Sequence, residues 1–189
     1  MPRKKKFDRS VQLEQAMHLF WQKGFADTSL VDIERALKVK APSIYATFGS
    51  KEKLFLESIG HYIQVVVESR IQTYLLEAPD PLTGIREFLI SGMGDPDKSA
   101  PGLGCLLTNS AAEFGTSKSE VADKIKNGLD RIRDAFEAAL LQVTSDQQSA
   151  SKMAATLLID FQGLMLLSKI KYDRASLITA IDHAIKNLK

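Results

Sequence analysis

Apolar residues in the first half of the chain recur every three or four positions, which is the spacing of one face of an amphipathic α-helix. This pattern predicts a helix over residues 8–23, built on Leu13, Ala16, Met17, Phe20 and Trp21. Gly24 ends it, because glycine readily adopts the left-handed conformation beyond a helix C-terminus, and Phe25 can supply the apolar contact of that cap. Thr28 and Ser29 offer hydroxyls to start a second helix, whose buried face is Leu30, Ile33 and Leu37.

A third short helix is predicted over residues 41–48, where Pro42 is favourable because its missing N–H would have no partner in a first helical turn. Gly49 and Ser50 end this helix, and Ser50 can cap a long one that runs to about residue 76. One stripe of the long helix is apolar and consists of Phe55, Ile59, Tyr62 and Val66. Three short helices therefore precede a long connecting helix.

The rest of the chain is predicted to be helical as well. Glycines and prolines between residues 92 and 104 predict a loop, and residues 145–151 predict a polar hinge. The segment 153–170 is apolar on more than one face, so it must be covered on two sides. Neither strand-like alternation nor an internal repeat occurs in the sequence. The predicted fold class is all-α, with an N-terminal three-helix head and a C-terminal helical body whose helices cover 81–93, 105–114, 121–143, 153–170 and 175–188.

The composition of the chain limits the cellular compartments and the kinds of functional site that can be expected. The chain has 189 residues, of which 44% are hydrophobic and 25% charged, as expected for a globular protein with a real core. Its longest apolar stretch, 154–168, is interrupted by Asp160 and Gln162, so no membrane-spanning helix is expected. The N-terminus lacks the apolar segment of a secretory signal, which predicts a cytoplasmic protein, and the single cysteine agrees. The three histidines lie far apart, so neither a metal nor another cofactor is predicted.

Positive charge is concentrated at the front of the chain. Residues 1–57 carry eleven Lys and Arg against seven Asp and Glu, whereas residues 58–189 carry fourteen against sixteen. The excess lies before Ser10, in a segment that contains Arg3, Lys4, Lys5, Lys6 and Arg9. Two interpretations stay open: a solvated tail, or a flexible arm that contacts phosphates and releases counterions.

The second and third helices are separated by a short turn, and this arrangement is typical of a helix-turn-helix DNA reader. Small helical domains without DNA partners share the spacing. At about 100° per residue, Ile44 and Phe48 must face the core, so Pro42, Ser43 and Ala46 point the opposite way, toward a major groove.

The flanks of the third helix complete the predicted interface. Tyr45 and Thr47 can donate hydroxyls to phosphates, and Lys40 can reach a phosphate or a guanine edge. Helix starts favour an adjacent phosphate, with plain N-capping as the alternative, and they carry Thr28, Ser29 and Lys51. Because the groove-facing set has few long hydrogen-bonding side chains, we expect specificity to depend on thymine methyl groups, Lys40 and operator deformability.

Residue identities sharpen this interpretation. The runs GFADTSLVDI at 24–33 and APSIYATFGSKEKL at 41–54 closely resemble the DNA-binding signature of the TetR family. The resemblance implies an α-helical homodimer that represses transcription at a palindromic operator until a small-molecule inducer binds the C-terminal part. It implies a DNA-binding domain at 7–67 and a ligand-binding and dimerisation domain at 68–189. Many relatives carry histidine in place of Thr47, and glycine or threonine near Ser43, so their operator sequences do not transfer.

The body offers fewer candidate residues. Pairing helices 119–143 and 152–169 with their twins would form a four-helix seam and space two reading heads. Cys105 follows a glycine-bearing loop and opens a helix, where exposed N–H groups favour a reactive thiolate. TetR-type repressors that it resembles around a Gly-Cys-Leu segment sense reactive species with such a cysteine; the alternative is a small buried apolar residue. Polar contacts to a ligand could come from Thr108, Asn109 and Glu113.

Other classes of function fit less well. An enzyme is not predicted, because the sequence has no glycine-rich phosphate loop, nucleophile elbow or metal signature. A DNA-bending protein would bind without sequence preference and with uniform salt sensitivity. A ligand-blind repressor, an activating helix-turn-helix regulator and an electrophile or redox sensor acting through Cys105 stay open as alternatives.

Overall fold

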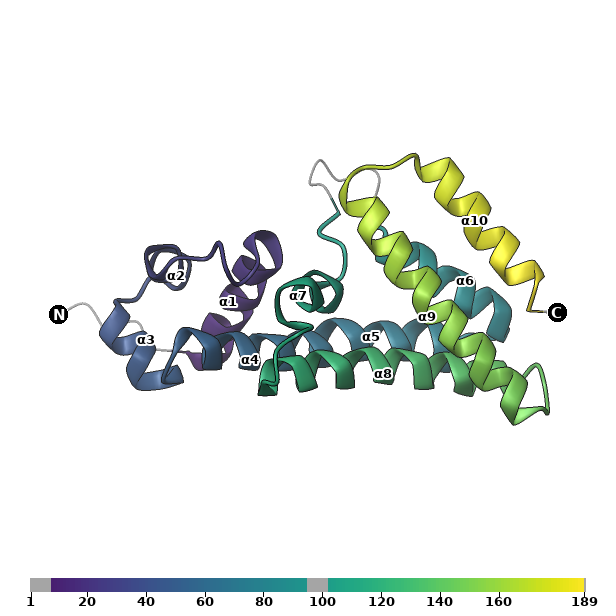
Figure 1. Cartoon of the computed structure of the whole chain (residues 1–189), viewed down its shortest axis with the longest axis horizontal. Helices are drawn as coiled ribbons and strands as arrows, with labels where there is room; N and C mark the ends of the chain where they lie inside the picture. The colour runs from purple at the N-terminus through teal and green to yellow at the C-terminus, as the bar shows by residue number, and fades with distance from the viewer. Residues whose placement is uncertain (1–7, 95–101, 189) are drawn as a thin grey trace.

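The computed structural model describes residues 8–94 and 102–188, and within these ranges every regular element is helical. The all-α prediction is confirmed, with a head of three short helices at one end and a helical body at the other (Figure 1). The head comprises α1 (Arg9–Lys23), α2 (Leu30–Leu37) and α3 (Ala41–Phe48), close to the predicted bounds. Arg3, Lys4, Lys5 and Lys6 of the predicted arm lie outside the described residues.

Local caps explain where the head helices begin and end. Gly24 follows α1 with φ at +81°, a conformation that favours glycine. Ser29 and Asp32 form a capping box at the start of α2, in which each side chain accepts the other's backbone N–H. Lys38 ends α2 in the left-handed region, which turns the chain sharply into α3. The crossing of α2 and α3 therefore follows from the short turn between them.

One long helical run leads from the head into the body. It consists of α4 (Lys51–Tyr62), a π-helical turn η1 (Ile63–Val67), α5 (Glu68–Ile71) and a second π-helical turn η2 (Gln72–Leu76). Ser50 caps its start, as predicted. The sequence predicted the continuous helix but not its two π-turns, which shift the face that each later residue presents.

The body is a bundle of α6 (Pro81–Gly92), α7 (Leu106–Phe114), α8 (Glu120–Leu140), α9 (Gln147–Lys169) and α10 (Arg174–Lys186). Two corrections concern α8 and α9. The predicted polar hinge at 145–151 is wrong, because Asp146 caps α9 and the helix starts at Gln147. The apolar positions of α8 are buried inside the chain, namely Val121, Ile125, Gly128, Ile132, Ala135, Phe136, Ala139 and Leu140.

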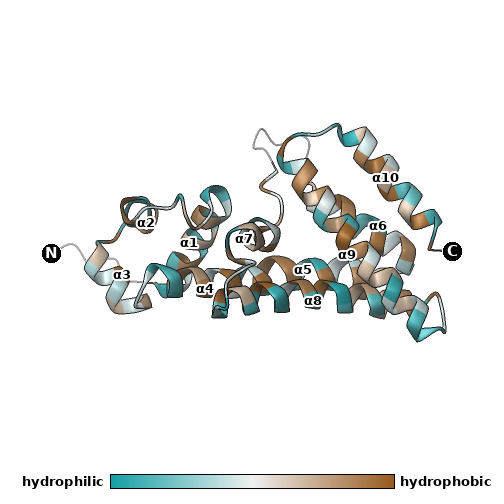
Figure 2. Cartoon of the chain, viewed as in Figure 1, coloured by the Kyte–Doolittle hydropathy of each residue, from teal (hydrophilic) through white to brown (hydrophobic). Residues whose placement is uncertain are grey.

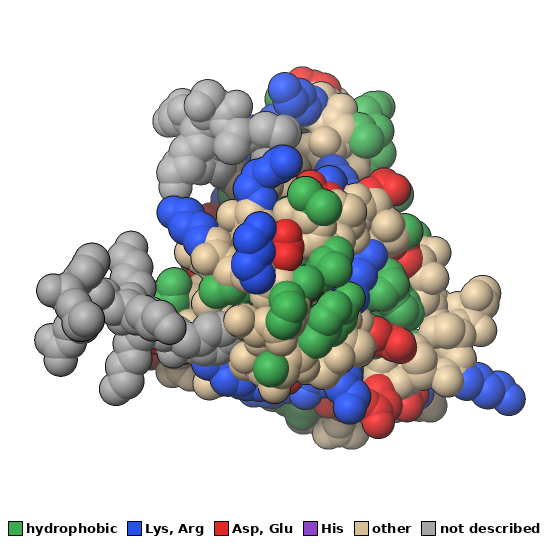
Figure 3. All heavy atoms as spheres, turned by 90° about the vertical axis from the view of Figure 1, so that its left-hand side faces the viewer, with side chains coloured by type: hydrophobic (Ala, Val, Ile, Leu, Met, Phe, Trp, Pro, Cys, Tyr) green, Lys and Arg blue, Asp and Glu red, His purple; other side chains and the backbone are tan. Residues whose placement is uncertain are grey.

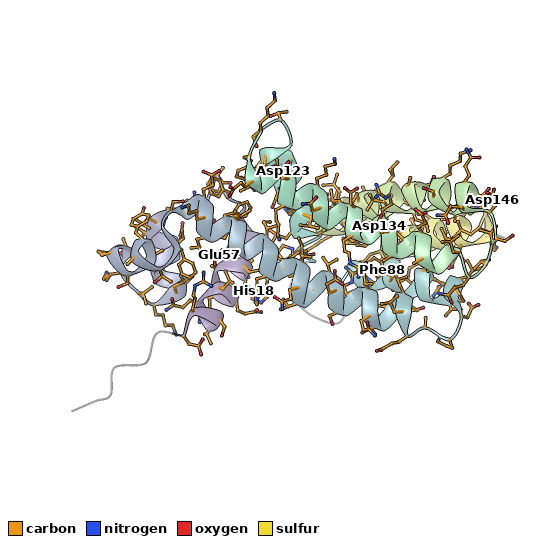
Figure 4. All side chains as sticks on the ribbon, turned by 90° about the horizontal axis from the view of Figure 1, so that it is seen from below. His18, Glu57, Phe88, Asp123, Asp134 and Asp146 are labelled. Carbon is orange, nitrogen blue, oxygen red and sulfur yellow. The ribbon has the colours of Figure 1, made fainter. Side chains whose placement is uncertain are left out.

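The outer face of α8 is charged, whereas the sequence predicted that this helix pairs with its twin in a dimer seam. Lys124, Lys126, Arg131 and Asp134 are all exposed, and hydrophilic positions of α8 follow the lower edge of the molecule (Figure 2). Asp123 and Asp134 lie along the same helix in the view from below (Figure 4). The apolar side of α8 instead packs against α4 and α9.

By length and mean hydropathy, α9 meets the criteria for a membrane-spanning helix, contrary to the expectation from sequence. Core helices of water-soluble proteins meet the same criteria. In the present fold α9 packs along α8, and one of its faces is buried through Ala150, Ala154, Leu157, Phe161, Leu164 and Met165. Its hydropathy therefore has an explanation inside the bundle.

Candidate nucleic-acid interface

α3 presents one face to the core and the other to the surroundings. Ile44 and Phe48 are buried, 1% and 3% exposed, whereas the opposite face is open. The exposed residues of this helix are Pro42, Ser43, Tyr45 and Ala46. The head end of the molecule shows apolar side chains with lysine and arginine side chains around them (Figure 3). The geometry brings these four predicted residues together on one convex surface.

Glu34 anchors the start of α3. Its Oε1 accepts the backbone N–H of Ala41 at 2.7 Å, so α2 caps the first turn of α3 with a carboxylate. Its Oε2 lies 3.7 Å from Nζ of Lys40, whose side chain is 86% exposed. The sequence analysis did not predict that Glu34 caps α3. The available signal was a carboxylate seven residues before the first residue of that helix. Lys40 is consequently held beside the exposed face yet remains free to reach outward.

Two more cations border the same surface. Arg35 and Lys38 are exposed and, with Val31, Val39 and the Glu34–Lys40 pair, line a shallow hollow of about 400 Å³ formed by α2 and the turn that follows it. Sequence reasoning did not select them, because spacing alone does not say which side of α2 remains uncovered. Three positive side chains thus surround the turn before α3.

Several predicted contact residues use their polar groups within the chain. Thr28 is completely buried and its hydroxyl donates to the Gly24 carbonyl at 2.6 Å, so its predicted contact with a phosphate is contradicted. Ser29 is exposed and caps α2. Thr47 donates its hydroxyl to the Ser43 carbonyl at 2.9 Å. The ammonium of Lys51 lies 4.3 Å from the centre of the Phe25 ring, a cation–π contact.

Arg9 is the only member of the predicted basic arm within the described residues. Its guanidinium pairs with the Glu57 carboxylate and lies 5.1 Å from the centre of the Phe48 ring. Arg9 therefore joins α1, α3 and α4 at the base of the exposed helix.

Cys105 lies deep at the junction of head and body. It forms the N-cap of α7, as predicted, but only 2% of the residue is exposed. Tyr62 donates its hydroxyl to the sulfur at 3.6 Å, and burial raises the pKa of Tyr62 well above its ordinary value. In this conformation Cys105 is therefore a small buried residue, which is the alternative to a reactive thiolate.

The remaining sensing candidates are used in contacts within the chain. Glu113 accepts the backbone N–H groups of Phe25 and Ala26 at 3.1 and 2.7 Å, so it caps the α1–α2 turn. Asn109 donates to the Leu103 carbonyl at 2.9 Å. Their predicted contacts with a ligand stay a prediction.

α7 consequently binds the head through several kinds of contact. Glu113 reaches the α1–α2 turn, and Phe114 packs on Phe25 and Phe55, with ring centres 5.1 and 5.4 Å apart. The Trp21 indole donates to the Gly104 carbonyl at 3.1 Å, directly before Cys105. A displacement of α7 would therefore be transmitted to α1.

Comparison with known proteins agrees with this architecture. Residues 13–58 match the family described as bacterial regulatory proteins, tetR family, and residues 81–183 match the C-terminal domain of LmrA/YxaF-like transcriptional regulators. The HTH-type transcriptional repressor ComR of Escherichia coli K12 is 28% identical over 148 residues, which cover 78% of this chain and 68% of ComR. The uncharacterized regulator YezE of Bacillus subtilis 168 is 27% identical over 198 residues and the full length of both chains.

A solved structure resembles nearly the whole chain. A cysteine mutant of the TetR family regulator CifR, in complex with 26-base-pair operator DNA, superposes with a TM-score of 0.83 at 27% identity, over 97% of this chain and 98% of CifR. The fold and the exposed helix define a helix-turn-helix transcriptional regulator. The chain belongs to the TetR family of transcriptional regulators, and, as predicted, this is a family of regulators and not of enzymes.

Proposed function

We propose that this protein is a repressor that binds a palindromic operator as a homodimer and leaves it when a small molecule binds the body. The observation that carries the proposal is the exposed face of α3, where Ser43, Tyr45 and Ala46 stand beside the 86% exposed side chain of Lys40. The DNA-binding domain is assigned to 7–67 and the ligand-binding and dimerisation domain to 68–189. The operator-bound CifR mutant, 27% identical, supports double-stranded DNA as the partner.

Contacts to DNA are assigned from the exposure of each side chain and its place on its helix. Pro42 and Ala46 can meet thymine methyl groups, and Ser43 and Tyr45 can donate hydroxyls to base edges or phosphates. Lys40, Ser29 and the ammonium of Lys51 lie at helix starts, where N–H groups and positive charge favour phosphates. Thr47 contributes its methyl group, because its hydroxyl is bonded to its own helix.

The dimer is proposed to form through α9 and α10. Ile159 and Leu166 on α9 are 71% and 56% exposed, and between α9 and α10 lies an apolar groove of about 750 Å³. Exposed apolar surface of this extent favours a protein partner. A symmetric pair of such faces gives the four-helix seam that two reading heads need. This proposal keeps the predicted homodimer and replaces α8 by α10 in the seam.

Sequence-selective binding is the decisive test. Fluorescence anisotropy should measure the affinity for DNA from upstream of the protein's own gene and for a scrambled duplex of equal length, at several salt concentrations. We expect the upstream DNA to bind about a thousandfold more tightly. Equal affinity for both duplexes would contradict the proposal and favour a DNA-bending protein. Adding candidate compounds then distinguishes a ligand-released repressor from a ligand-blind one.

The assigned face can be tested with Ala46→Glu. A carboxylate at this exposed position would repel phosphates, so operator affinity should fall at least tenfold while the melting temperature is unchanged. The matched control is Ala138→Glu, which adds the same charge at an exposed alanine of α8. Equal affinity of the two variants would remove α3 from the interface.

A second candidate function is electrophile sensing through Cys105. The observation that favours it is the position of Cys105 beside Gly104, whose carbonyl accepts the Trp21 indole N–H, so a bulky adduct would disturb α1. With iodoacetamide as the electrophile, the thiol proton passes to water, the thiolate attacks the methylene carbon, and an S–C bond forms as the C–I bond breaks and iodide leaves. Cys105→Ser should then retain DNA in the presence of iodoacetamide while the unmodified chain releases it. Equal release from both would exclude the thiol as the sensor.

A further inference from the structure

Arg70 is a partly buried cation in the middle of the body. It lies on α5, and its guanidinium is enclosed by aromatic rings, 4.5 Å from the centre of Phe88 and 5.3 Å from the centre of Phe161. Phe88 marks this region in the view from below (Figure 4). Burial lowers the pKa of Arg70, which reflects the cost of keeping its charge away from water.

Within the described residues, the hydrogen bonds of Arg70 go to neutral acceptors. Nε and one terminal nitrogen donate to the Ser91 hydroxyl at 3.1 and 3.0 Å, and that terminal nitrogen also donates to the Phe88 carbonyl at 2.6 Å. Across residues 8–94 and 102–188, no carboxylate forms an ion pair with this guanidinium. Charges withdrawn from water in proteins are normally paired, so this guanidinium can accept a carboxylate partner from outside the described residues.

A second donor without an acceptor comes from α9. The side-chain Nε2 of Gln162 is buried and has no hydrogen-bond partner within the described ranges, while its Oε1 is held by the Thr108 hydroxyl. An amide nitrogen buried in this way is costly and rare. The unsatisfied amide, like the guanidinium, calls for a hydrogen-bond acceptor.

Arg70 lies close to Met165 of α9, and Gln162 is on the same helix. A Cβ at Gly92 would stand 2.5 Å from Cε of Met165 and 2.8 Å from a terminal nitrogen of Arg70, so Met165 and Arg70 meet above this glycine. Gln162 precedes Met165 by three residues and shares its side of α9. Met165 is unbranched and adaptable, and can swing aside to admit a ligand atom. The surroundings of the Arg70 guanidinium are apolar through Phe88, Phe161 and Met165.

We propose that the body binds small organic carboxylates with an apolar group, with Arg70 taking the carboxylate and the Gln162 amide donating to it. The guanidinium offers a planar pair of N–H donors that matches a carboxylate, and the rings beside it accommodate an aromatic or alkyl group. This inference rests on the proposed function, because it names the chemical class of the ligand that the body would sense.

Thermal denaturation of the full chain tests the proposal without DNA. The probes are benzoate, phenylacetate and octanoate, each compared with its neutral amide at the same concentration. We expect at least one acid to raise the melting temperature saturably, by about 3–6 °C at ten times its Kd, and its amide to have no effect. No shift with any of the acids, or equal shifts with acid and amide, would overturn the proposal.

Variants assign the effect to the site. Arg70→Met should abolish the shift and keep or raise the melting temperature of the free chain, because the Phe88 carbonyl retains the Ser91 hydroxyl as a donor. Gln162→Glu should also abolish it, by supplying an internal carboxylate. The control is Arg86→Met, which removes an arginine paired with Asp182 and should keep the ligand response. An undiminished response in Arg70→Met would refute the assignment even if Gln162→Glu failed to fold.

Operator binding separates this inference from the function on which it rests. If an acid binds through Arg70 but leaves DNA affinity unchanged, the carboxylate site stands and ligand-relieved repression by these acids fails. If a compound of another class releases DNA while none of the acids binds, the carboxylate site fails and ligand-relieved repression stands.

Discussion

At the scale of single residues, the head divides its polar side chains between holding the fold and facing outward. Thr28 and Thr47 bond to backbone carbonyls, whereas Ser43 and Tyr45 point away from the core. This division explains why the interface consists of small residues. The threonine hydroxyls form hydrogen bonds within the chain, and the side chains that remain exposed on α3 are mostly short. Discrimination between operators then depends on close approach of α3 to the bases, which small side chains allow.

The Asp32 carboxylate gives the head a dependence on pH. Hydrogen bonds from Lys23 and Ser29 lower its pKa in the folded state, so its contribution is complete above an unfolded pKa of about 4 and is lost as pH falls through the lower folded pKa. Asp32→Asn should therefore reduce the free energy of unfolding at pH 7, and the difference from the unmodified chain should shrink toward pH 2. Urea denaturation at both pH values checks this.

The exposed Asp27, which lies outside the capping box, provides the control for this measurement. Asp27→Asn should alter the free energy of unfolding little at either pH. A constant difference for Asp32→Asn across the range would contradict the assigned role of the carboxylate.

At the scale of elements, α7 is the part of the body that touches the head most intimately. It contacts α1 and α4, and its Glu113 caps the α1–α2 turn. Cys105 caps the start of α7, and Thr108 in its first turn donates its hydroxyl to Gln162, which belongs to the inferred carboxylate site. A ligand in the body would therefore act on the heads through this short helix.

Glu113→Ala should loosen the head without unfolding the chain. It leaves the N–H groups of Phe25 and Ala26 without their acceptor, so hydrogen exchange should speed up in 24–30, and stability should fall by about 1–2 kcal/mol. Mass spectrometry of hydrogen exchange measures the first effect. Glu120→Ala, at an exposed carboxylate of α8, should leave exchange in 24–30 unchanged. If both variants behave alike, Glu113 does not couple α7 to the head.

At the scale of the whole molecule, the elongated chain separates a reading end from a pairing end. α3 lies at one end, and α9 and α10 lie toward the other, joined by the long run of α4, η1, α5 and η2 (Figure 1). In a dimer paired through α9 and α10, the spacing of the two heads depends on this long run, and its π-turns are positions where the run can change register. By changing the distance between the two heads, the body can change DNA binding without covering the surface that contacts DNA.

Ile159→Lys should convert the proposed dimer to a monomer. The side chain is 71% exposed in the single chain and would be buried in the seam, where an unpaired charge is costly. Light scattering during size-exclusion chromatography measures the mass, and operator affinity should fall together with it. Leu76→Lys is the control, because Leu76 is 54% exposed and lies on η2, away from the groove. A monomeric unmodified chain would contradict the proposal directly.

The sequence determined the features of this protein that depend on neighbours a few residues away. The three short helices, their caps at Gly24, Ser29 and Ser50, and the inward direction of Ile44 and Phe48 follow from helical periodicity and backbone satisfaction, both local properties. The all-α class and the family resemblance rest on these same segments.

Only the tertiary structure decided which groups meet across the chain. The burial of Thr28 and Cys105, the bond from Glu113 to a turn 88 residues away from it, and the charged outer face of α8 are set by packing between distant helices. The contacts of the Arg70 guanidinium with Ser91, Phe88 and Phe161 belong to the same group. Periodicity says that a helix has an apolar face, but the partner that covers the face is chosen by the burial of apolar area and the pairing of polar groups in the whole bundle.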